Sequence, residues 1–144
     1  MITKTSDADF LLLLALQRAT HVTLHVLSTR LAALGLTPAE INALANIPAG
    51  ARLKVSELAA AIGSRPSTAT SVLDRLEQRG HVERTPHPTD RRAVVVSLSP
   101  SGRRAARTIR QEVTALEREC LSGLSVAALS GLRSGLQAFA KAGS

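Results

Sequence analysis

Residues 67–84 read STATSVLDRLEQRGHVER, and residues 90–102 read DRRAVVVSLSPSG. The first stretch spaces its apolar residues as one side of a helix does, and Gly80 follows as a residue that commonly ends helices. The second stretch contains three valines at 94–96 and then Ser99-Pro100, a pair typical of a helix start. Together they predict a helix, a pair of short strands and a further helix.

The segment before and around these stretches predicts a compact motif. Apolar spacing indicates a helix over residues 55–62, and Ser64 is expected to cap the next helix, over about 65–79. A hairpin is expected over 81–86 and 93–98, because turn-forming residues separate these two runs. A tight joint between two helices, followed by a hairpin, is the order of a winged helix-turn-helix.

The residue types on the outward side of the helix at 65–79 indicate what that side binds. Its first half carries hydroxyl groups and an arginine, and no acid precedes Asp74. Such groups hydrogen-bond to base edges and phosphates in a major groove. The residues concerned are Arg65, Ser67, Thr68, Thr70 and Ser71. The hairpin tip carries Arg91 and Arg92, which we expect to reach an adjacent minor groove of double-stranded DNA.

The charge distribution supports the same partner. The chain has 144 residues and a formal net charge of +7, and residues 52–110 hold twelve Lys and Arg against five Asp and Glu. A localised excess of this kind indicates a phosphate-binding surface. A coding bias toward arginine is an alternative source of the Arg excess, but it does not explain the clustering. Aromatic residues are only 1%, which argues against base-stacking modules for single strands.

Further helices are expected on both sides of this motif. Thr37-Pro38-Ala39-Glu40 has the pattern of a capping box at the start of a short helix, and Arg52–Lys54 is expected to form a short strand or bridge. Leucines at helical spacing predict one long helix over residues 9–34, ended by Gly35. Two helices are expected near the other end, over 100–121 and 125–140, with inward-facing apolar residues in the last at Leu129, Leu132, Leu136 and Phe139.

The outer helices carry more apolar surface than one small subunit buries, which indicates a homodimer. The expected fold is therefore mainly α with a small β-hairpin wing. Its winged helix-turn-helix core is flanked by N- and C-terminal dimerisation helices. The boundaries follow as an N-terminal dimerisation helix at 1–36, a DNA-binding domain at 37–99 and C-terminal dimerisation helices at 100–144.

Residues 67–84 resemble the recognition helix and first wing strand of the MarR family of regulators. Residues 90–102 resemble its wing, an Asp-x-Arg followed by a strand and Leu-Thr-x-x-Gly, with Ser99 in place of the usual Thr. The resemblance covers nearly the whole chain. It implies an obligate homodimer that binds a pseudo-palindromic operator, most simply as a repressor.

The resemblance also implies roles for individual residues. Arg92 would enter the minor groove, Asp90 would orient it, and Arg91 would contact phosphate or lie alongside. Solvated turn residues are the alternative for all three. Arg75 would contact the groove or a phosphate, or else pair with an acid of its own helix, Asp74 or Glu77.

Family members often release DNA when a small anionic aromatic effector binds. His21 and His25 share a helix face, and Arg18 lies one turn earlier, so these three are the candidate effector residues. Polar residues at a helix surface or subunit interface are the alternative. No metal or cofactor is expected, because a closed zinc site needs about four ligands. Cys120 is expected to be an inert core residue rather than a redox sensor.

Other classes of protein fit the sequence less well. It contains no Gly-x-Ser-x-Gly elbow, phosphate loop or His-Glu-x-x-His, so we expect no enzyme. A winged-helix module for nonspecific DNA coating or protein assembly is the alternative function. The longest apolar run, Phe10–Leu16, is much shorter than the ~20 residues that span a bilayer, and acids precede it. We therefore expect a cytoplasmic protein without membrane contact.

Overall fold

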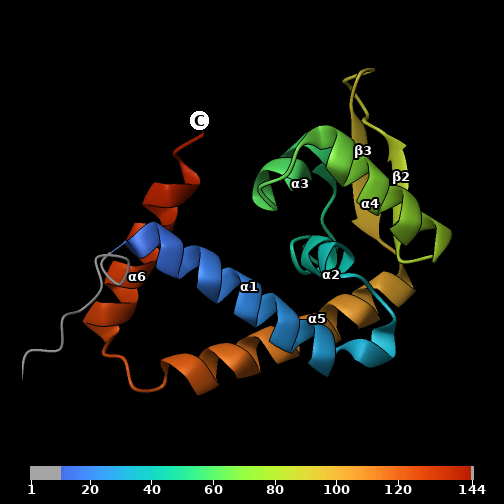
Figure 1. The fold of residues 1–144 in the computed structure, drawn as a ribbon. Helices are drawn as coiled ribbons and strands as arrows, with labels where there is room; N and C mark the ends of the chain where they lie inside the picture. The colour runs from blue at the N-terminus through green and yellow to red at the C-terminus, as the bar shows by residue number, and fades with distance from the viewer. Residues whose placement is uncertain (1–10, 144) are drawn as a thin grey trace, which may run out of the picture.

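The computed structural model describes residues 11–143, and the chain forms a winged domain set on long helices (Figure 1). The elements follow in the order α1 (Leu12–Arg30), the 3-10 helix η2 (Ala32–Leu34), α2 (Pro38–Ala45), β1 (Leu53–Lys54), α3 (Val55–Ala61), α4 (Pro66–Gln78), β2 (Val82–Pro86), β3 (Val94–Leu98), α5 (Pro100–Leu121) and α6 (Val126–Ala140). This architecture confirms the predicted fold class. The domain boundaries at residues 36 and 99 remain a proposal.

Local capping explains where several helices begin. At α2 the hydroxyl of Thr37 accepts from the Glu40 amide, and the Glu40 carboxylate accepts from the Thr37 amide, so the predicted capping box is present. At α5 the Ser99 hydroxyl accepts from the Gly102 amide, with Pro100 in the first helical position. Both starts were predicted from the sequence.

Two predicted boundaries were wrong. The first helix ends at Arg30 rather than at residue 34, because the buried Leu31 leaves helical geometry and the chain tightens into η2 before Gly35 adopts a positive φ. Residues 9 and 10 of that prediction lie outside the described part. Ser64 does not cap α4: its hydroxyl donates to the Arg65 carbonyl, and Arg65 is the N-cap because Pro66 requires an extended residue before it.

The predicted hairpin forms, and a third strand joins it. Strands β2 and β3 are antiparallel, with Val82 opposite Leu98, and β1 pairs with the other edge of β3. The two residues of β1 had been predicted as a strand or a bridge. In the sheet order β1-β3-β2, strand β1 leads directly into α3 and pairs with β3 of the wing. The pairing of β1 with β3 therefore fixes the helix pair α3–α4 against the wing.

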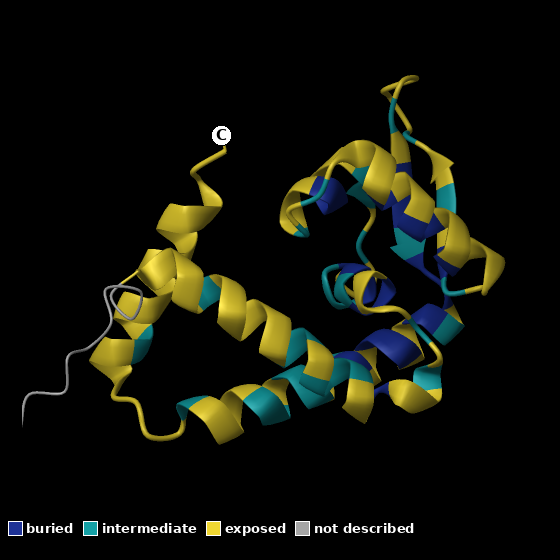
Figure 2. Ribbon diagram, in the orientation of Figure 1, coloured by how far each residue is buried: buried dark blue, intermediate teal, exposed yellow. Residues whose placement is uncertain are grey.

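The core lies inside the winged domain. It joins α2, α3, α4, the sheet and the first half of α5, and the buried residues fall between Leu31 and Ile109 (Figure 2). Helices α1 and α6 contain no buried residue in this chain alone. The prediction that the last helix packs its apolar side inward is therefore wrong for the single chain. Its larger side chains are exposed or half-buried, as seen at Leu129, Leu132, Leu136 and Phe139.

A close contact fixes α5 to the turn between α4 and β2. The His81 carbonyl accepts from the Ser99 amide at 3.0 Å, and the Ser99 hydroxyl donates to the Gly80 carbonyl. The Ser101 hydroxyl lies 3.0 Å from Nδ1 of His81. Burial, and then the nearby charge of Arg79, lower the pKa of His81, which favours the neutral ring beside Ser101. A Cβ on Gly102 would lie 1.8 Å from the His81 carbonyl oxygen, so this position excludes any side chain.

We expect Gly102→Ala to lower the free energy of unfolding by about 3 kcal/mol, because the added methyl group must displace the start of α5 from the turn. Chemical denaturation at fixed protein concentration measures this loss. Gly123→Ala is the matched control, since a Cβ there meets nothing within 4 Å. Equal stability of the two variants would contradict the contact at Gly102.

Candidate nucleic-acid interface

Helix α4 divides cleanly into a buried and an exposed side. Four apolar residues from Ala69 to Leu76 are buried in the core. The side chains predicted to face DNA are all exposed, at Arg65, Ser67, Thr68, Thr70 and Ser71. The core thus fixes which side of α4 faces outward.

Two of these hydroxyl groups already use their only proton. The Thr70 hydroxyl donates to the Pro66 carbonyl at 2.9 Å, and the Ser71 hydroxyl donates to the Ser67 carbonyl at 3.2 Å. A carbonyl oxygen can only accept, so the outward lone pairs of these two hydroxyls are left as acceptors. Amino groups of adenine and cytosine are matching donors in a major groove.

Side chains bind the backbone at the tip of the wing. Nδ1 of His87 accepts from the amides of Thr89 and Asp90, at 3.2 and 3.0 Å. Oδ1 of Asp90 accepts from the Arg92 amide at 3.0 Å, so the observed contact of Asp90 is with the backbone of Arg92. The side chains of Arg91 and Arg92 are exposed, and within residues 11–143 neither has an ion-pair partner.

A cleft of about 410 Å³ lies between α4, the start of α3 and the wing. It is lined by Lys54, Val55, Ser56, Pro66, Thr70, Arg84, Asp90, Arg92, Ala93 and Val94. Of the residues predicted to contact DNA, Thr70, Asp90 and Arg92 line this cleft together. Sequence reasoning missed Lys54 and Ser56, whose only indication was the local charge excess and the nearby helix start.

The two acids of α4, Asp74 and Glu77, form ion pairs with Arg84 and not with Lys54 or Arg92 of the cleft. Arg84 of β2 lies 2.6 Å from Asp74 and 3.2 Å from Glu77. Its hydrogen bond lowers the pKa of the Glu77 carboxyl, which favours the charged state. Both negative charges of α4 therefore have a cation beside them, and the unpaired arginines of the wing give the surface its sign.

Arg75 forms neither of the ion pairs, with Asp74 or Glu77, that were the alternative to a DNA contact. Its Nε donates to Oε1 of Glu40 in α2 at 3.0 Å, rather than to an acid of its own helix. The exposed half of its side chain lies on the surface of α4. Sequence spacing could not predict this pair, because the partners are 35 residues apart.

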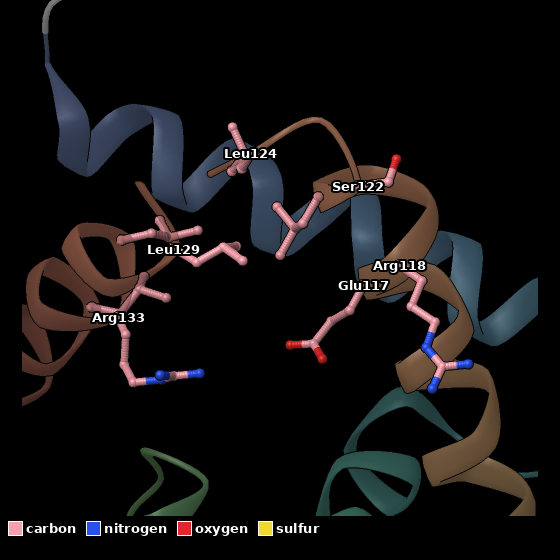
Figure 3. A pocket seen from close by; sticks show the side chains of 9 residues that line it. Glu117, Arg118, Ser122, Leu124, Leu129 and Arg133 are labelled. Carbon is pink, nitrogen blue, oxygen red and sulfur yellow. The ribbon is translucent and has the colours of Figure 1, made fainter. Parts of the chain in front are cut away.

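The candidate effector residues Arg18, His21 and His25 lie on α1 and are exposed. Two cavities lie on the other long helices. One, of about 500 Å³, follows α5 and is lined by Ala49, Leu98, Arg103, Ala106, Arg107, Arg110, Gln111, Thr114, Ala115 and Arg118. The other, of about 470 Å³, lies between α5 and α6, where Glu117 and Arg133 point into a space with leucine walls (Figure 3).

Cys120 is exposed, so the expectation of a core residue was wrong. It lines a smaller cavity between α1 and α5, where the single chain leaves these helices uncovered. Within the described residues, no three His, Cys, Asp or Glu side chains are grouped to hold a metal ion. No described helix has the length and apolarity needed to cross a membrane.

Comparison with known proteins supports the family resemblance. Residues 36–94, which include the helix pair and most of the wing, match the sequence model of the MarR family. The resemblance to the MarR family is confirmed for this part of the chain. The Escherichia coli multiple antibiotic resistance protein MarR is 35% identical over 77 residues, which are 54% of each chain. The Bacillus subtilis transcriptional repressor MdtR is 41% identical over 68 residues, 47% of this chain and 44% of MdtR.

Solved structures of this family agree with the fold. CouR of Rhodococcus jostii, bound to p-coumaroyl-CoA, has a TM-score of 0.82 at 25% identity and covers 96% of this chain and 97% of its own. A mutant E. coli MarR complexed with operator DNA has a TM-score of 0.72 at 26% identity, over 94% and 98%. The chain spans about half the length of the curated relatives it matches. MdtR is named as a transcriptional repressor, in agreement with the prediction that this chain is not an enzyme.

We expect Arg92→Ala to weaken DNA binding about tenfold and to reduce the salt slope of binding by about one, because the unpaired guanidinium is a candidate DNA contact. Fluorescence anisotropy with labelled duplexes over a range of salt concentrations measures both. Arg104→Ala removes the same charge from the exposed surface of α5 and is the control. Equal losses in both variants would show that only net charge matters.

Proposed function

We propose that this protein is a sequence-specific, DNA-binding transcriptional regulator that acts as a repressor. The observation that carries the proposal is one surface made by the hydroxyl face of α4 and the basic wing tip, on either side of a cleft. A recognition helix in the major groove and a wing arginine in the minor groove fit this arrangement. The relative MdtR is named as a repressor, and a protein that covers a promoter blocks polymerase most simply.

We propose further that the protein binds a pseudo-palindromic operator as a homodimer. Large apolar side chains of α1 and α6 are exposed in the single chain, including Leu12, Leu13, Leu14, Val22, Val126, Leu132, Leu136 and Phe139. A surface of this kind commonly marks a protein–protein interface. The leucine-lined space between α5 and α6 offers room for helices of a second copy (Figure 3). The segments 1–36 and 100–144 would then serve dimerisation, and 37–99 DNA binding.

A dimer of this kind places two recognition helices about 34–36 Å apart, one turn of DNA. The proposed site of action is the cytoplasm, where DNA and the transcription machinery are accessible. The alternative function is a winged-helix module that coats DNA without sequence preference or assembles with proteins. The acid-free first half of α4 favours sequence reading over this alternative.

Selection of bound duplexes from random DNA at about 150 mM salt tests the proposal. The expected result is an enriched inverted repeat with half-sites about 10 bp apart, because two symmetric subunits read two half-sites. Binding that fades with rising salt and enriches no sequence would contradict specific regulation. Enrichment of a single half-site would contradict the dimer.

We also propose that a small anionic aromatic effector releases the protein from DNA. CouR, a protein of similar structure, is bound to p-coumaroyl-CoA in its crystal structure, which supports a ligand of this chemistry. The exposed trio Arg18, His21 and His25 supplies cations on one side of α1. The groove along α5 supplies four arginines beside apolar walls, so it is a second candidate location.

Titration of the DNA complex with salicylate tests this effector proposal. Release is expected in the wild type, and loss of release in the double variant His21→Ala/His25→Ala would locate the ligand at α1. Loss of release in Arg107→Ala instead would locate it at the α5 groove. A wild-type complex that salicylate leaves intact at millimolar concentration would overturn the proposal for aromatic carboxylates.

A further inference from the structure

Glu40 is a buried acid directly beneath the candidate recognition helix. Only 3% of its surface is exposed, although it belongs to the first turn of α2. Its Oε1 accepts from Nε of Arg75, and its Oε2 lies 3.6 Å from Nη1 of Arg79 and accepts from the Thr37 amide at 3.3 Å. A buried carboxylate requires such partners, so the charge of Glu40 holds Arg75 of α4 and Arg79, the C-cap residue of that helix, in place.

The two arginines differ in what remains free. Nη1 of Arg79 donates to the Gly35 carbonyl, which attaches α4 to the chain after η2. Arg75 uses only Nε, and both of its Nη nitrogens have no partner in the part of the chain that the structure describes. About half of its side chain is exposed. Arg75 is therefore the arginine that Glu40 holds in one orientation while leaving donors available.

Arg75 also lies on the side of α4 that faces outward. It follows Ser71 by four residues and Thr68 by seven, and such spacings share one helix face. An arginine fixed at Nε presents its two Nη groups as a planar pair of donors. Fixing the side chain before binding reduces the entropy lost on contact with a ligand.

We propose that Glu40 is a positioning residue for DNA recognition, which orients the Arg75 guanidinium so that its Nη groups donate to a pair of acceptor atoms on DNA. The inference rests on the proposed DNA-binding function. A phosphate and the O6/N7 edge of guanine both supply such a pair. Loss of Arg75 lowers the salt slope by about one in the first case, and lowers discrimination between sequences at an unchanged slope in the second.

The direction in which Glu40→Gln changes DNA affinity distinguishes a positioning role of Glu40 from a purely electrostatic one. Glu40→Gln removes a negative charge next to a DNA-binding surface, which by charge alone would strengthen binding. Positioning predicts the reverse, about a tenfold loss of affinity for the duplex that the wild type selects. Glu119→Gln is the matched control, because it removes the same charge from an exposed pair with Arg30, at 2.6 Å between α5 and α1. This control is expected to bind no more weakly than the wild type.

A double-mutant cycle completes the test, with thermal melting of each variant as the measure of folding. Arg75→Gln is expected to lose at least as much affinity as Glu40→Gln, and the double variant no more than Arg75→Gln alone. Arg75→Lys is expected to bind about tenfold more weakly, because lysine cannot pair with Glu40 and still offer two further donors in one plane. This variant leaves the buried acid in place and decides the question if Glu40→Gln fails to fold.

Several results would overturn the inference. Affinity of Glu40→Gln equal to or above that of the wild type would show that Glu40 does not position Arg75 for binding. Wild-type affinity in Arg75→Lys and Arg75→Gln would show that Arg75 does not contact DNA, while the selected operator would still support the proposed function. Failure of the wild type to select any duplex would overturn the proposed function and this inference together.

Discussion

The close approach of Gly102 to the His81 carbonyl leaves no space for a side chain between α5 and the winged domain. It allows the start of α5 to lie directly on the turn that ends α4 and begins β2. Arg110, two turns further along α5, donates to the carbonyls of Ala45 and Ile47 at the end of α2, at 2.8 to 3.2 Å. Because α5 is attached at these two points, we expect a shift of the long helix to move α4 and the wing with it.

The second organising feature is the pairing of the acids of α2 and α4 with arginines, whereas the exposed Asp90 of the wing tip, within residues 11–143, accepts only from backbone, at the Arg92 amide. Asp74 and Glu77 pair with Arg84, and the buried Glu40 pairs with Arg75 and Arg79. The wing tip has no such pairs among the described residues, so Arg91 and Arg92 are left free for phosphate or a narrow minor groove. If the same net charge were spread evenly over the chain, the wing tip would not be a positively charged surface.

Local chemistry was predictable from the sequence, and long-range pairing was not. The capping residues Thr37 and Ser99, and the hairpin, follow from a few neighbouring residues, and each is present. The outward face of α4 was predictable because helical period determines which side is apolar. The ion pair of Glu40 with Arg75 and the hydrogen bonds of Arg110 to α2 could not be predicted, because the partners lie 35 and about 65 residues away. The exposed apolar face of α6 was misjudged because spacing shows that a face is apolar but not which chain covers it.

The specificity ratio of the protein at about 150 mM salt tests whether α4 and the wing read DNA sequence. Affinity is measured for the selected inverted repeat and for a scrambled duplex of equal length, together with the number of chains per duplex. A sequence-reading dimer predicts at least about a thousandfold preference for the repeat, with two chains bound. A preference below about tenfold, with chains accumulating in proportion to DNA length, would contradict sequence reading by α4 and the wing.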